Sequence, residues 1–125
     1  MHKFFYILVL FLGLSIQAQT ALYNSGNIRI HDQGQLGFHT DLINDAAFDE
    51  NVGLVGFYGN NQLYVSGAFA PTFFDMEIAN NTGVLLQTGI NNVNNTNFII
   101  GDFLTFKNQT EAFYNFLQNS FYVGD

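Results

Sequence analysis

The chain has 125 residues, of which 48% are hydrophobic, 17% aromatic and only 10% charged. It contains no cysteine, which excludes a disulfide framework, a thiolate zinc site and a cysteine nucleophile. Three Lys and Arg residues face ten Asp and Glu residues, and the formal net charge of -7 leaves no basic patch that could bind nucleic acid. These values indicate a small acidic protein of one domain, rich in aromatic residues and glycine.

The first 18 residues have the pattern of a helical secretory signal peptide. A short basic start precedes the apolar run 4–14, and small and polar residues then lead to Ala18. A membrane-spanning helix needs about 20 apolar residues, so cleavage after Ala18 is favoured over a membrane anchor. We therefore expect a secreted or cell-surface protein with no membrane span after cleavage. Residues 19–125 would carry two basic and ten acidic residues, a formal charge of -8.

Residues 19–125 alternate between short apolar runs and turns rich in Asn and Gly. Such turns recur every 8–12 residues or so, around runs of four to six strand-forming residues, which is typical of all-β folds. In one run, Phe74, Met76 and Ile78 alternate and are expected on one face. The pattern predicts a single β-rich domain over 19–125, an irregular right-handed β-solenoid, with a β-sandwich as the alternative.

Sixteen asparagines favour turns and stacked coils over helices, because the Asn side chain competes for helical backbone hydrogen bonds. In stacked coils we expect asparagine ladders, in which amides pair from one coil to the next. Two segments are ambiguous. In 108–117 the spacing of Asn108 and Glu111 allows a helix, but strands are favoured. In 41–49, acids four residues apart disfavour a helix, so an extended or loop conformation is expected.

The densest acidic cluster gives the candidates for a calcium site: Asp41, Asp45, Asp49 and Glu50. Calcium requires several oxygen ligands at once, and this segment lacks the residue order of an EF-hand loop. A solvated acidic surface is therefore the favoured interpretation, and no cofactor is expected apart from this calcium candidate.

Other polar residues do not form a catalytic motif. His31 and His39 are seven residues apart with no third ligand suggested, so a zinc site is not expected. Asp75 and Glu77 lie two apart, as in an acid pair of a glycosidase, but ten acids produce such a pair by chance. No serine lies in a nucleophile elbow. We predict no catalytic and no cofactor-binding residues.

Exposed aromatic rings beside Asn and Asp side chains could bind sugars by stacking. The candidates are Tyr58, Tyr64 and Tyr114, although aromatic residues of β-proteins more often lie in the core. A carbohydrate-binding module is thus one alternative function, and a fragment of an extracellular enzyme is another.

Four stretches carry a resemblance to a known family: residues 22–31, 37–44, 48–59 and 89–101. The chain resembles the N-terminal part of large Bacteroidetes surface proteins that end in a gliding-motility-associated C-terminal domain and are exported by type IX secretion. The resemblance implies a non-enzymatic, adhesin-like structural module whose partners are glycans or other surface proteins. In that family further β segments follow, so the resemblance also implies that 19–125 is an incomplete fragment.

The C-terminal segment predicts self-association. Residues 113–117 and 121–123 are rich in aromatic and aliphatic side chains, with no proline or lysine to discourage pairing of an open strand edge. We expect residues 19–125 to associate through this C-terminal edge despite the charge of -8.

Overall fold

The computed structural model describes residues 21–105 and 112–124, and every regular element in this part is a β-strand. The predicted signal peptide lies outside the described residues. In chain order the strands are β1 (Ala21–Asn24), β2 (Gln35–Phe38), β3 (Asp41–Asn44), β4 (Leu54–Gly59), β5 (Leu63–Ser66), β6 (Thr72–Asn80), β7 (Val84–Leu86), β8 (Ile90–Ile100), β9 (Phe103–Thr105), β10 (Tyr114–Phe116) and β11 (Phe121–Gly124). Within these residues no helix is long and apolar enough to cross a membrane.

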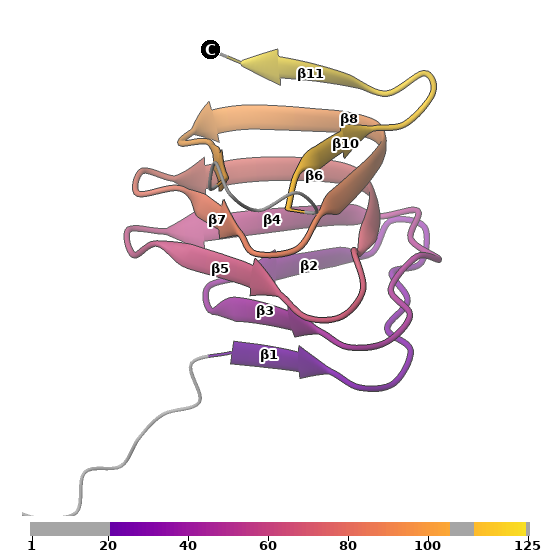
Figure 1. The fold of residues 1–125 in the computed structure, drawn as a ribbon. Coiled ribbons are helices and arrows are strands. Elements are labelled where there is room, and N and C mark those ends of the chain that lie inside the picture. The colour runs from indigo at the N-terminus through magenta and orange to yellow at the C-terminus, as the bar shows by residue number, and fades with distance from the viewer. Residues whose placement is uncertain (1–20, 106–111, 125) are drawn as a thin grey trace, which may run out of the picture.

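The strands form two parallel sheets that the chain enters alternately. One sheet has the order β1-β3-β5-β7-β9, and the other has β2-β4-β6-β8, with β10 and β11 both paired to β8. In Figure 1 the odd-numbered strands from β1 to β7 run to the right in front, and β4, β6 and β8 return to the left behind them, while the chain rises. This path is a right-handed β-solenoid, which confirms the predicted fold. The sandwich alternative is wrong, because every strand pair is parallel.

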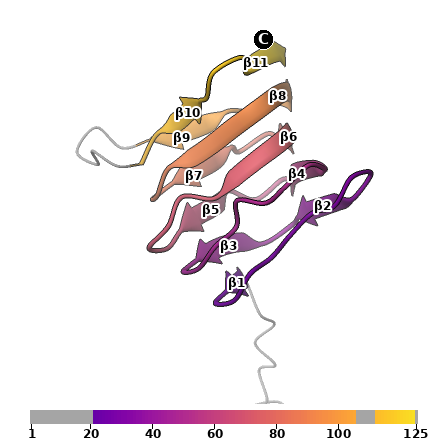
Figure 2. The same ribbon diagram turned by 90° about the vertical axis from the view of Figure 1, so that its right-hand side faces the viewer.

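The coils stack in register, so equivalent residues of successive coils form rows along the solenoid (Figure 2). Phe38 of β2, Phe57 of β4 and Ile78 of β6 make one inward-facing row, and all three are buried. The Phe38 and Phe57 rings stack with centroids 5.1 Å apart. Rows of this kind fill the space between the two sheets, and the core combines four buried phenylalanines with aliphatic side chains.

The predicted alternation in β6 is partly wrong. Met76 and Ile78 are buried as expected, but Phe73 rather than Phe74 fills the core beside them. The cause is an irregularity in the pairing of β6 with β8, where the register shifts between Phe73 and Asp75. Here β8 advances three residues, from Asn92 to Asn95, while β6 advances two, and the alternation of the β6 side chains is broken at Phe74.

Asparagine ladders form between coils, as predicted. The Nδ2 atom of Asn24 donates to Oδ1 of Asn44 over 2.7 Å, and both side chains are buried. Asn44 in turn donates to the carbonyl oxygen of Phe69 in the next coil. Near the other end, Asn115 donates to Oδ1 of Asn91 over 2.8 Å. These amides satisfy buried and partly buried backbone and side-chain groups of neighbouring coils.

The two ambiguous segments are resolved in favour of extended structure. Asp41–Asn44 is strand β3, and the chain then continues as a loop, as expected. Tyr114–Phe116 is strand β10, which confirms the strand prediction there. The proposed helix start at Asn108 and Glu111 lies outside the described residues.

Candidate functional site

A group of charged side chains lies where two successive coils approach each other ahead of β2 and β4. Parallel bridges join Asn27 to Ala47 and Ile30 to Asn51 at this corner. A hollow of about 370 Å³ opens there, lined by Arg29, Ile30, His31, Asp49, Glu50, Asn51 and Val52. We treat this corner as the candidate site, because it brings together a guanidinium, an imidazole and two carboxylates.

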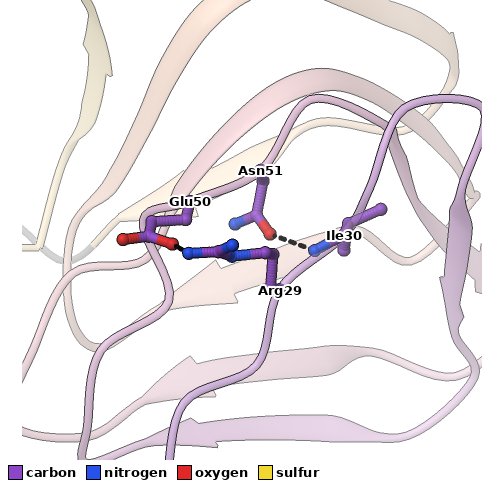
Figure 3. A network of polar contacts seen from close by, with 4 residues as sticks. All are labelled: Arg29, Ile30, Glu50 and Asn51. Carbon is purple, nitrogen blue, oxygen red and sulfur yellow. Dashed lines mark hydrogen bonds and ion pairs between the residues drawn. The ribbon is translucent and has the colours of Figure 1, made fainter.

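Two polar contacts join the coils at this corner (Figure 3). Arg29 forms an ion pair with Glu50, and about half of each side chain is exposed. Asn51 is buried, and its Oδ1 accepts a hydrogen bond from the backbone N–H of Ile30 over 2.8 Å. Its Nδ2 donates to the carbonyl oxygen of Thr72 over 2.8 Å, so one side chain links three consecutive coils.

The contacts at this corner hold one coil against the next. An exposed ion pair contributes only about 0–1 kcal/mol. The buried amide of Asn51 matters more, because it satisfies a buried backbone donor and a partly buried backbone acceptor. Within residues 21–105 and 112–124, no three His, Asp or Glu side chains converge in a way that could hold a metal ion.

The four calcium candidates do not share one site. Asp41 accepts a hydrogen bond from the N–H of Tyr64, and Asp45 accepts one from the N–H of Ala68, each over 2.9 Å. Both acids thus bind backbone groups 23 residues ahead, in the next coil. Glu50 pairs with Arg29 and Asp49 lines the hollow. Three of the four candidates are therefore engaged in contacts between coils.

The histidines and the acid pair lie in different surroundings. His31 lines the corner hollow, whereas the ring of His39 lies 5.4 Å from that of Tyr58 on the outer face of the second sheet. Asp75 accepts a hydrogen bond from Nδ2 of Asn94 over 2.7 Å. Glu77 accepts one from the hydroxyl of Tyr58. Each of these two carboxylates has a separate hydrogen-bond partner.

Tyr58 lies flat on the outer face of the sheet. Gly37 and Gly56 are paired neighbours beneath its ring, and a Cβ atom added to Gly56 would lie 2.0 Å from the Tyr58 side chain. The ring occupies the space that these two glycines leave, and its hydroxyl reaches Glu77 in the following coil. Burial, the hydrogen bond to Glu77 and the charge of that carboxylate raise the pKa of Tyr58 to about 12.

Tyr114 belongs to an aromatic cluster at the end of the core. Its ring stacks on Phe103 with centroids 4.9 Å apart and meets Phe98 edge-on. Its hydroxyl is hydrogen-bonded to Thr96. Burial raises the pKa of Tyr114 to about 12, against the opposing effect of the hydrogen bond with Thr96. Of the three candidate tyrosines, only Tyr64 has an exposed ring.

Sequence reasoning did not identify the individual asparagines that join the coils. Asn24, Asn44 and Asn80 are each the last residue of a strand, and all three are buried. An Asn directly after an apolar run is therefore the signal in this chain for a buried linking amide.

Comparison of the chain with family models, with curated proteins and with solved structures finds no match. The functional interpretation therefore depends on the fold and on the contacts described above.

Proposed function

We propose that the chain is a non-enzymatic structural module of a secreted or cell-surface protein, of the adhesin-like kind. One observation carries this proposal: the side chains best suited to bind a ligand or to catalyse a reaction are engaged in contacts between coils. Asp41, Asp45 and Asn51 bind backbone groups of neighbouring coils, and Glu77 binds Tyr58. Such use of polar groups suits a rigid extended scaffold, since a solenoid is stabilised by contacts between adjacent coils.

The sequence pattern supports a location outside the cytoplasm. The basic start, the apolar run 4–14 and the small residue Ala18 together suit export through the cytoplasmic membrane. Membership of the gliding-motility-associated surface proteins, which the sequence resembles, is part of the same proposal.

Export can be tested by expressing the chain from Met1 with a C-terminal tag in a bacterium. We expect mass spectrometry of the extracytoplasmic fraction to find a protein that begins at Gln19, because the signal peptide is removed on export. A variant with Ala18→Arg should keep its leader, since a large charged residue does not fit the cleavage position. An intact wild-type chain that stays in the cytoplasm would contradict the proposal.

Carbohydrate binding is a second candidate, favoured by the exposure of Tyr64. Its ring lies on the outer face of the first sheet, in one row with Leu85 and Leu104. A flat, exposed aromatic surface is the usual platform for a sugar ring. Binding to a glycan array that is lost on Tyr64→Ala, with folding unchanged, would favour this function over a purely structural one.

A further inference from the structure

In the described residues both sheets contain the same number of stacked levels. The first sheet has five strands, and the second has five levels, because β10 and β11 pair one after the other along the same strand, β8. Figure 2 shows β1 at one end of the stack and β11 at the other. A second copy placed on the C-terminal end would therefore lay its β1 on β9 and its β2 on β11, and both sheets would continue in the same order.

The hydrophobic core is incompletely covered at both ends. Its partly buried members belong to the first coil and to the last two: Leu22, Ile28, Leu36, Phe98, Phe103 and Tyr114. The C-terminal level adds the exposed side chains of Phe116, Phe121 and Tyr122, the last with 63% of its surface accessible. Both ends thus present apolar surface that burial against another coil would stabilise.

The end strands lack the residues that normally prevent edge pairing. The sequences of β1, β2, β9, β10 and β11 contain no charged residue and no proline. The charged residues that lie in described strands are Asp41 of β3 and Asp75 and Glu77 of β6, which are interior strands. Natural sheets usually place charges or proline on their edges to block association. In this protein the charged strand residues lie in interior strands and the edge strands carry none.

The registers fix how two ends would meet. One inward row runs through the second sheet from Leu36 to Val55, Met76, Thr96 and Tyr122. Continuing this row across the junction places Tyr122 of one copy beside Leu36 of the next. We propose that the protein associates head to tail with further copies of itself, the C-terminal edge of each copy pairing with the N-terminal edge of the next.

The geometry of such an assembly follows from the fold. A head-to-tail contact uses two different surfaces, and because here it continues the stack of strands along the solenoid axis it does not close into a ring, so it produces filaments. Adjacent strands are about 4.8 Å apart, and five levels per copy give an axial repeat of about 24 Å. The inference concerns the ends of the solenoid and does not depend on the proposed function.

Two variants, each blocked at one end, test the proposal. Leu36→Lys places a charge at the N-terminal edge, and Tyr122→Lys places one at the C-terminal edge. Leu36 is half-buried and Tyr122 is exposed, so at either position a lysine can extend its amine to solvent in the single chain. Each protein is expressed from Met1, its N-terminus is established by mass spectrometry, and its mass is measured by size-exclusion chromatography with light scattering.

We expect the wild-type protein to form a concentration-dependent series of oligomers and each variant alone to be a monomer. An equimolar mixture of the variants should double in mass to a dimer with one copy of each, because one intact C-terminal edge meets one intact N-terminal edge. A monomeric wild type, or a mixture that stays monomeric, would overturn the proposal. A dimer of Leu36→Lys alone would also overturn it, since two C-terminal edges would then pair with each other.

Circular dichroism establishes that each variant is folded, and a second pair replaces a variant that is not. Leu54 donates its N–H to the carbonyl oxygen of Gly34, so by the alternation of a parallel ladder the N–H of Gln35 faces the open edge. Gln35→Pro removes that edge donor without removing an interior hydrogen bond. Val123→Lys is the matching change at the exposed C-terminal edge. The expected masses are those of the first pair.

Discussion

Replacing Phe73 with alanine is expected to lower the free energy of unfolding by about 3–5 kcal/mol, the usual cost of removing a large aromatic side chain from a core. Phe73 is fully buried, and its ring meets Phe48 edge-on with centroids 5.1 Å apart. The rings of Phe38 and Phe57 lie further away, at 6.5 and 6.4 Å. The loss therefore opens a cavity among three aromatic neighbours from the two preceding coils.

Phe69 provides the matched control, because 58% of its surface is exposed and its hydrogen bonds with Asn44 use only its backbone N–H and carbonyl groups. Phe69→Ala should change the free energy of unfolding by no more than about 0.5 kcal/mol. Urea denaturation followed by circular dichroism measures both variants. Equal losses for Phe73→Ala and Phe69→Ala would show that the core is not where the structure places it.

Asn80→Ala should be the second large destabilisation, at about 2–4 kcal/mol, because at least three hydrogen bonds to backbone groups are lost at about 0.5–1.5 kcal/mol each. Asn80 is fully buried at the end of β6. Its Nδ2 donates to the carbonyl oxygen of Asn61 over 2.7 Å, and its Oδ1 accepts from the N–H groups of Thr82 and Gly83. The side chain thus holds the turn after β6 against the coil before it.

The neighbouring Asn81 serves as the control for this amide. It is exposed, and the described residues include no hydrogen-bond partner for its side chain. Asn81→Ala should therefore leave the midpoint of thermal unfolding nearly unchanged, whereas Asn80→Ala lowers it clearly. If the two midpoints fall together, the amide of Asn80 does not have the linking role described here.

The strands and the general use of asparagine could be predicted from the sequence because both are local. Apolar runs such as Leu54–Tyr58 lie between turn residues, and β4 forms there, over Leu54–Gly59. The irregularity that buries Phe73 in place of Phe74 was not predictable, because it arises from the pairing of β6 with β8 rather than from the residues of β6 alone.

Contacts of the candidate site could not be predicted because the length of a coil varies. Asn24 contacts Asn44 20 residues ahead, Asp41 binds Tyr64 23 residues ahead, and other coils advance by 19. Without a constant period, sequence reasoning cannot assign which acid faces which backbone group. The acidic residues could be found, but their hydrogen bonds to the next coil could not.

The raised pKa values of Tyr58 and Tyr114 predict how stability depends on pH. In each case the folded state favours the neutral phenol, because burial disfavours the phenolate. These two phenols have a pKa of 10.0 in the unfolded chain and of about 12 in the folded protein. The stabilising contribution is therefore complete below pH 10 and is lost as the pH rises toward 12.

The central claim is that Tyr58 and Tyr114, two of the three candidate binding tyrosines, belong to the stack of coils, and the ionisation of these two phenols tests it most directly. Carbon-13 NMR of labelled tyrosine rings can follow the two phenols in the folded protein, with Tyr58→Phe and Tyr114→Phe assigning the signals. The structure predicts that both still carry their protons well above pH 10 and ionise near pH 12. Ionisation of both near pH 10, with the protein folded, would mean that these rings face solvent and would contradict the account.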